Sequence, residues 1–169
     1  MKKIVLTFGL LSGLIISGMF VLTIPLMDGM SFEQGAVVGY ASMLAASLLI
    51  YFGIRSYRDN VGGGVVRFGR AFAVGILIVT VSNVLYVATW KVVHPRFMPD
   101  FYQKYEAAAI EKARARNAPE KEIEDIKKSI VMYQHPILNP LITFLEPMPV
   151  GLLVTLISAW VLSRRRQPV

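Results

Sequence analysis

"IVLTFGLLSGLIISGMFVLTIPLM", residues 4–27, is a run of 24 residues without a charged side chain. As an α-helix it would be about 36 Å long, enough to cross the hydrocarbon core of a bilayer. Lys2 and Lys3 precede it, as basic residues precede the apolar part of a secretory signal peptide. The run is longer than the roughly 7–15 apolar residues of a signal peptide, however, and no A-x-A-like cleavage site follows it. The stretch therefore predicts a retained membrane helix.

Three further runs of similar length follow. We predict membrane spans over residues 4–27, 35–54, 71–90 and 141–163, with Glu146 as the only charged residue inside them. The chain is 54% hydrophobic and 17% charged, whereas an ordinary soluble domain is about 25% charged. We therefore expect residues 1–169 to form a single all-α membrane domain, an integral membrane four-helix bundle with four transmembrane helices.

The distribution of Lys and Arg predicts how the chain crosses the membrane. Bases gather before the first span, between the second and third spans and after the fourth: Lys2, Lys3, Arg55, Arg58, Arg67, Arg70, Arg164, Arg165 and Arg166. The loop between the first and second spans carries only the acids Asp28 and Glu33. The positive-inside rule then places both termini in the cytoplasm. The net charge of +7 is a topology signal on this interpretation, and no nucleic-acid partner is expected.

A polar segment separates the third and fourth spans. Residues 97–134 predict an extracytoplasmic helical hairpin. Asp100 and Gln103 resemble a capping box that would start its first helix, and Pro119 is favoured at the start of a second. The second helix has apolar residues at helical spacing, Ile123, Ile126 and Ile130. Two interpretations stay open: a solvated hairpin and a docking surface for a partner.

The single charge in the fourth span lies in "ITFLEPMPVGLL", residues 142–153. Counting back about 20 residues from the end of the span places Glu146 near the outer interface. Two prolines follow it and favour a helix that starts here, whose free amide groups would stabilise a carboxylate. We favour a helix cap, or an ion pair with Lys91 or Arg96, over a proton carrier, which usually lies deeper in the membrane.

Asn83 is the most polar side chain near the middle of the third span, and Tyr86 follows it within one helical turn. We favour an interhelical hydrogen bond that fixes helix packing. The alternative interpretation is functional, with Glu146, Asn83 and Tyr86 lining a path for an ion or small solute.

Small residues recur four positions apart in every predicted span. Such spacing lets helix backbones approach closely, within one chain or between copies in a homo-oligomer. The residues are Gly9, Gly13, Gly35, Gly39, Ala71, Gly75, Gly151 and Thr155.

The loop between the second and third spans lies in "RSYRDNVGGGVVRFGRAF", residues 55–72. Its three glycines, residues 62–64, have neither Walker nor G-x-G-x-x-G spacing, so we interpret them as a flexible turn. The arginines on either side are expected to contact anionic lipid head groups of the bilayer. They are Arg55, Arg58, Arg67 and Arg70.

No residue pattern indicates catalysis. The chain has no cysteine, no H-E-x-x-H and no G-x-S-x-G. His94 and His135 bracket the polar segment, but two separated histidines are too few ligands for a metal site. We therefore expect no catalytic residues, no bound metal and no cofactor.

Several stretches together resemble one family. They are "IYFGIRSYRDN", "FGRAFAVGILIVTVSNVLYVATW", "PDFYQKY" and "FLEPMPVGLLVTLISAWVLSRRR". This pattern is similar to the bacterial membrane family called "domain of unknown function 4199", found mainly in Bacteroidetes and relatives. The resemblance implies a four-helix protein of the bacterial cytoplasmic (inner) membrane, with residues 55–59 in its most recognisable segment. It implies no activity.

Three functional hypotheses follow. The first is a non-enzymatic accessory or scaffold subunit that meets a membrane protein partner through its outer hairpin. The second is a small oligomeric transporter or channel that uses Glu146 and Asn83. The third is a protein that binds anionic lipid through the four loop arginines.

Overall fold

The computed structural model describes residues 1–164, apart from the side chains of residues 27 and 28, and this part of the chain is helical without strands. The elements are α1 (Lys2–Thr23), the short 3₁₀ helix η1 (Ile24–Gly29), α2 (Phe32–Asn60), α3 (Phe68–Phe97), α4 (Phe101–Ala115), α5 (Glu120–Gln134), α6 (Leu138–Leu145) and α7 (Met148–Arg164).

Four segments are long and apolar enough to cross a membrane: Lys2–Leu26, Phe32–Asn60, Phe68–Phe97 and Leu138–Arg164. The second segment begins earlier than the predicted span 35–54 because a capping box starts the helix. Ser31 Oγ accepts a hydrogen bond from the backbone amide of Gln34, whose side chain accepts one from the Ser31 amide.

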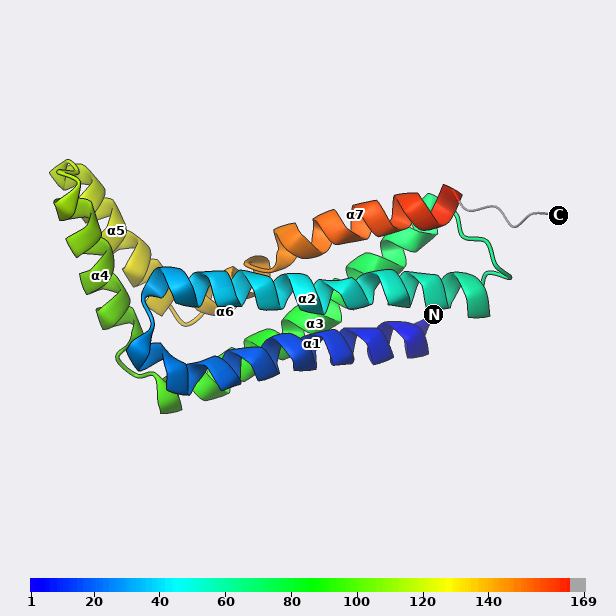
Figure 1. Ribbon diagram of the computed structural model, residues 1–169, viewed down its shortest axis with the longest axis horizontal. Coiled ribbons are helices and arrows are strands. Elements are labelled where there is room, and N and C mark those ends of the chain that lie inside the picture. The colour runs from blue at the N-terminus through cyan, green and yellow to red at the C-terminus, as the bar shows by residue number, and fades with distance from the viewer. Residues whose placement is uncertain (165–169) are drawn as a thin grey trace.

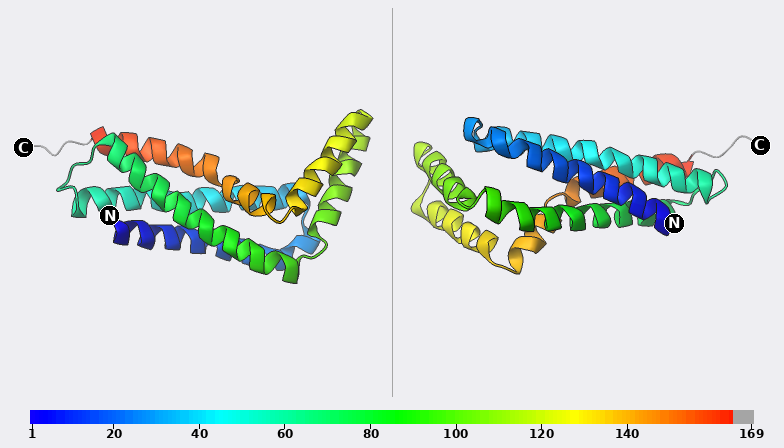
Figure 2. Two further views of the ribbon diagram at one scale, coloured as in Figure 1. Left: turned by 180° about the vertical axis from the view of Figure 1, so that it is seen from behind. Right: turned by 90° about the horizontal axis from the view of Figure 1, so that it is seen from below.

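The four long segments lie side by side, with α1 packed against α2 and α3, and α7 also packed against α2 and α3. Met1, the loop of residues 61–67 and Arg164 lie at one end, which we call the terminal end (Figure 1). At the opposite end, which we call the α4–α5 end, α4 and α5 pack together and point away from the axis of the long helices (Figures 1 and 2).

Close helix packing is concentrated at the terminal end. Ile54, Ile78 and Leu162 are fully buried there in one apolar cluster. The glycines of this region make the contact possible, because a Cβ added to Gly75 would lie 2.5 Å from Thr155 Cγ2. Gly9, Gly13 and Gly151 are packed in the same way, at 2.6, 3.0 and 2.9 Å. Small residues in α1, α3 and α7 therefore allow close approach, as predicted.

Within one chain, the prediction does not hold for Gly35 and Gly39 of α2. A Cβ added to Gly35 or Gly39 would meet nothing within 4 Å. The same four-residue spacing here leaves space beside the helix instead of bringing a neighbour closer.

The fourth segment is two helices. Pro147 lies at the break between α6 and α7, and its missing N–H removes a helical hydrogen bond. The predicted helix start is correct for α7, but α6 precedes it. Glu146 therefore lies inside the segment Leu138–Arg164, where α6 ends and α7 begins. Its place near the outer interface stays a prediction.

The segment 97–134 contains two helices, α4 and α5, and α5 follows Pro119 as predicted. Their contact buries Ala113, Ile123 and Ile130 to 3% exposure or less. The predicted capping box is not formed, because Asp100 makes no side-chain cap hydrogen bond at the start of α4.

Candidate functional site

A cavity of about 830 Å³ lies at the α4–α5 end, lined by residues of α1, η1, α2, α3, α4, α5 and α6. Ile16, Phe20 and Met43 form part of its apolar wall. Gly35 and Gly39 line it too, which explains the open space beside these glycines. The room for the cavity therefore comes partly from the lack of side chains on the first turns of α2.

Tyrosines are concentrated around this cavity. Five of the seven tyrosines of the chain line it: Tyr40, Tyr86, Tyr102, Tyr105 and Tyr133. They come from α2, α3, α4 and α5, so the fold gathers them from distant parts of the sequence. Each offers an aromatic face and a polar hydroxyl, a combination suited to a ligand with both apolar and polar parts.

Glu146 is the acidic group at the helix break, and its side chain is exposed on the cavity wall. Within residues 1–164 it makes no hydrogen bond or ion pair, so neither the expected cap nor a pairing with Lys91 or Arg96 is formed. Lys91 donates instead to the carbonyl oxygen of Pro136 at 3.4 Å. The carboxylate is left available to whatever enters the cavity.

The negative charge of Glu146 acts on the tyrosines around it. Burial raises the pKa of the Tyr133 phenol, and the charge of Glu146 raises it further. Burial also raises the pKa of Tyr102. Both shifts start from an ordinary value near 10, so the two hydroxyls stay protonated at neutral pH and can donate hydrogen bonds.

Asn83 supports the break without lining the cavity. Its Nδ2 donates to the carbonyl oxygen of Phe144 at 2.9 Å, and the residue is 3% exposed. Asn83 thus makes an interhelical hydrogen bond to a backbone group two residues before Glu146. The structure brings Glu146 and Tyr86 together on the cavity wall and leaves Asn83 outside it.

The cavity narrows toward the terminal end. The next space along the helices, lined by Ser12, Asn83 and Pro147 among others, measures only about 10 Å³. Beyond it lies the apolar cluster that contains Ile54 and Leu162. The cavity is therefore closed on this side.

Contacts from α4 and α6 cover the other side. Phe32 at the start of α2 packs edge-to-face against Phe101 and Tyr105 of α4, with ring centroids 6.0 and 5.4 Å apart. Lys112 forms an ion pair with Glu33 that also joins α4 to α2. These contacts fix α4 over the mouth of the cavity.

Asn139, which the sequence analysis missed, anchors the same cover from α6. Its Nδ2 donates to the hydroxyl of Tyr102 at 2.5 Å and to the carbonyl oxygen of Tyr133 at 2.8 Å. One side chain thus joins α4, the end of α5 and α6. An asparagine just before a proline gave no sign of this role in the sequence.

The two histidines have separate surroundings. His94 stacks on Trp90 with ring centroids 4.8 Å apart, and its Nε2 is buried without a hydrogen-bond partner. His135 Nδ1 accepts from the amides of Ile137 and Leu138 at 3.3 and 3.4 Å, at the start of α6. Among the residues that the structure describes, no three His, Asp or Glu side chains are grouped as a metal ion would require.

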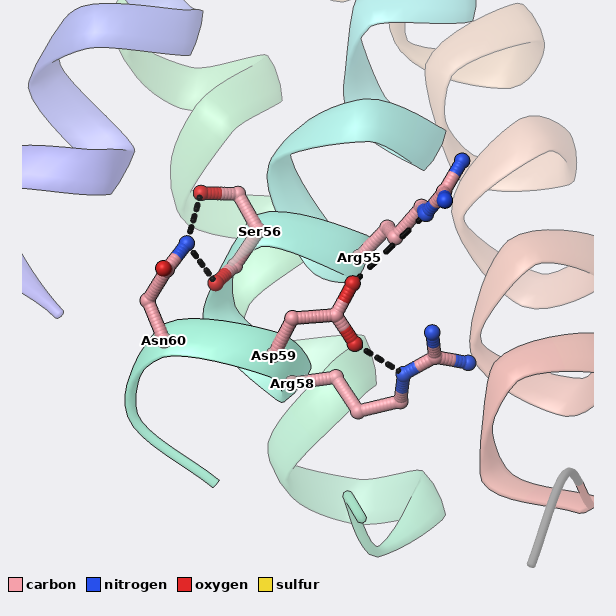
Figure 3. Close-up of polar contacts among 5 residues, drawn as sticks. All are labelled: Arg55, Ser56, Arg58, Asp59 and Asn60. Carbon is pink, nitrogen blue, oxygen red and sulfur yellow. Dashed lines mark hydrogen bonds and ion pairs between the residues drawn. The ribbon is translucent and has the colours of Figure 1, made fainter. Parts of the chain in front are cut away.

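Two of the four predicted loop arginines, Arg55 and Arg58, lie in the last turns of α2 and share one acidic neighbour (Figure 3). Asp59 accepts from Arg58 Nε at 2.7 Å and lies 3.6 Å from Arg55 Nε, so it offsets part of their charge. The glycines beside them form a specific turn, because Gly63 and Gly64 have positive φ values of 61° and 86°. The cavity is lined in part by α4 and the end of α5, which lie at the opposite end of the molecule from the loop between α2 and α3 (Figure 1).

Four long apolar helical segments define the class of this chain, a multi-pass all-helical membrane protein. Its residues 7–164 match the family described as "Protein of unknown function (DUF4199)", and the chain belongs to this family. The resemblance noted in the sequence is thereby confirmed. No curated protein and no solved structure matches the chain.

Proposed function

We propose that this protein is a non-enzymatic, integral protein of the bacterial cytoplasmic membrane that binds an amphipathic small molecule in the cavity at its α4–α5 end. It is a four-helix bundle with both termini in the cytoplasm and an extracytoplasmic hairpin, α4 and α5, above the cavity. The observation that carries the proposal is the cavity of about 830 Å³ with five tyrosines and Glu146 on its wall.

The size and lining of the cavity support binding. Ligand pockets usually measure about 300–1,000 Å³ and combine an apolar wall with a few polar groups that orient the ligand. The cavity has this composition, with Phe20 and Met43 on its apolar side and Glu146 on its polar side. A wholly apolar ligand would leave the carboxylate and the tyrosine hydroxyls without partners, which is unfavourable in a low-dielectric site.

The orientation is supported by the bases at the terminal end. Lys2, Lys3, Arg67 and Arg70 lie in the segments that meet there, together with the arginine pair held by Asp59. The positive-inside rule places such an end in the cytoplasm. Arg164 lies over the ring of Trp160 at 4.0 Å, a pairing suited to the membrane interface. The assignment to a bacterial membrane follows the family resemblance.

Binding is a better explanation of the geometry than a channel. A channel needs a continuous polar path, whereas the space beyond the cavity shrinks to about 10 Å³ and then meets the apolar cluster. Asn83, expected to line such a path, already uses its amide to hold Phe144. We keep the non-enzymatic part of the accessory-subunit hypothesis and assign the function to the cavity beneath the hairpin.

Saturable binding of matched probes tests the proposal. Three dansyl-labelled decyl chains would end in a trimethylammonium group, an uncharged tert-butyl group or a carboxylate. The protein would be purified in a maltoside detergent, which has no charge of its own, and dansyl fluorescence compared with empty micelles. We expect at least one probe to bind saturably.

Two glycine variants give the matched comparison. Gly39→Leu adds a side chain on the cavity wall, and Gly18→Leu adds the same side chain where nothing lies within 4 Å and no cavity residue is changed. We expect Gly39→Leu to weaken probe binding about 10-fold or more, a change of about 1.4 kcal/mol. Gly18→Leu should bind as the native protein does. Equal affinities in the two variants, or no saturable binding of any probe, would refute the proposal.

A further inference from the structure

We propose that the ligand of this cavity carries an organic cation, and that its positive charge lies against Glu146 between tyrosine rings. This inference rests on the proposed binding function and names the chemical class of the ligand. Its apolar part would be an alkyl or similar chain.

The first argument is charge. Glu146 lies within an apolar membrane segment, and an ionised carboxylate in such a place is stabilised by a counter-charge. No base within residues 1–164 pairs with it. Lys112, the base that joins α4 to α2, is paired with Glu33, and Lys91 bonds a backbone carbonyl. A cationic ligand would supply the missing partner.

The other charged groups on the cavity wall agree with this sign. Asp100 adds a second carboxylate, and Lys104 is the base of the wall. Lys104 has an interaction of its own. The wall therefore has an excess of negative charge at Glu146, which would repel an anionic head group and attract a cationic one.

The second argument is the aromatic surroundings of the carboxylate. Tyr102 of α4 and Tyr133 of α5 line the same cavity as Glu146. Tyr86 lies on the same wall and contacts Phe20 edge-to-face at 6.2 Å. A cation is attracted to the negative face of an aromatic ring, and cages of such rings recognise quaternary ammonium groups.

Trp90 also lines the cavity. Its ring lies 4.8 Å from that of His94, stacked at 27°, and 5.2 Å from that of Phe20. The aromatic faces of the wall therefore come from Trp90 and from the tyrosines, and the tyrosines add hydroxyl groups. Their hydroxyl oxygens can also accept hydrogen bonds from an ammonium that carries protons.

The apolar wall gives a place for the tail. Ile16 and Met43 lie on the side of the cavity formed by α1 and α2, and Ile142 lies on α6. The open faces of Gly35 and Gly39 leave room along α2. A chain attached to a head group at Glu146 can therefore lie along α2.

The three dansyl probes test the inference, because the trimethylammonium and tert-butyl heads have nearly the same shape and differ in charge. We expect the native protein to bind the trimethylammonium probe about 10-fold or more tightly than the tert-butyl probe. Glu146→Gln should reduce this preference to about 2-fold or less while the tert-butyl affinity stays unchanged.

Glu124→Gln is the matched control, since it removes an exposed carboxylate of α5 that does not line the cavity, and the native preference should persist. If Glu146→Gln does not fold, the affinities of the native protein for the three probes still test the cationic assignment. Equal binding of the ammonium and tert-butyl probes, or preference for the carboxylate probe, would overturn the cationic assignment and leave the binding function standing. No saturable binding of any probe would refute both the cationic assignment and the binding function.

Discussion

The two ends of the long helices use the same residue type in opposite ways. At the terminal end, Gly9, Gly75 and Gly151 let neighbouring helices touch, and any larger side chain would collide with them. At the α4–α5 end, Gly35 and Gly39 touch nothing and border a cavity. The comparison shows that small-residue spacing reports only that space is left beside a helix. What fills the space is decided by the partner helix.

The difference follows from how the fourth segment is built. α7 packs against both α2 and α3 and closes the terminal end. The break at Pro147 ends that arrangement, and α6 continues in contact with α3 and α5. The first half of α2 therefore has a cavity where its second half has α7. The proline that breaks the helix thus also separates the closely packed end from the open one.

The largest expected effect is at Gly75. In Gly75→Val the new side chain would collide with Thr155, whose Cγ2 lies 2.5 Å from the added Cβ position. Overpacking of this kind costs about 1–3 kcal/mol or more, so we expect the free energy of unfolding to fall by at least that amount. The loss of stability can be measured by heating the protein in maltoside and monitoring how much of it stays monodisperse.

Gly39→Val is the matched control, because the same side chain there meets open space. We expect it to leave stability nearly unchanged while it reduces probe binding. If both variants were equally unstable, the distinction between a packed end and an open end would be wrong.

A second prediction concerns the boundary between the two ends. Asn83→Leu keeps the side-chain size but leaves the carbonyl of Phe144 without its donor. Interhelical hydrogen bonds in membranes contribute about 0.6–2 kcal/mol, so we expect a loss of about 1 kcal/mol in stability. Because the bonded carbonyl lies two residues before Glu146, we also expect a weaker preference for the cationic probe.

Thr80→Val is the control for this variant. The Thr80 hydroxyl donates to the Ile76 carbonyl of its own helix at 2.9 Å, so its loss removes no contact between helices. If Thr80→Val lost as much stability as Asn83→Leu, the interhelical hydrogen bond would have no special role at the break.

The sequence predicted the helical class and the approximate positions of the four membrane segments, because long uncharged runs have few other stable structures in a membrane. It also predicted the helix start after Glu146, since Pro147 lacks an amide hydrogen. It did not predict α6. Residues 138–140 lay between the predicted hairpin and the predicted fourth span, although "LNPLITFL" forms a helix of 8 residues before the break.

The cavity was harder to predict than the helices. Its tyrosines come from four helices, and their approach depends on the tilt of α4 and α5, which no local pattern encodes. Glu146 was recognised as exceptional, but its surroundings were not predicted, because the side chains that share the cavity with it come from other helices. Asn139 was missed because neither of its partners belongs to its own helix. Tyr102 lies in α4, far away in the sequence, and Tyr133 lies in α5.

The smallest and most local effect is expected at Asn139. Asn139→Ala removes the donors to Tyr102 and to the Tyr133 carbonyl, which join α4 and α5 to α6. These hydrogen bonds do not join the four long helical segments to one another, so the free energy of unfolding of the long segments should change little. Amide hydrogen exchange should instead become faster in α4 and the end of α5, because opening of a local unit requires less free energy when its anchor is lost.

Ser129→Ala serves as the control, since Ser129 bonds only the Asp125 carbonyl of its own helix at 2.9 Å. Faster exchange confined to α4 and α5 in Asn139→Ala alone would show that the cover of the cavity moves as a unit separate from the packed end. Exchange that increased equally in α1 and α7 would mean that the two ends unfold together. The cover could not then open for a ligand while the membrane helices stay packed.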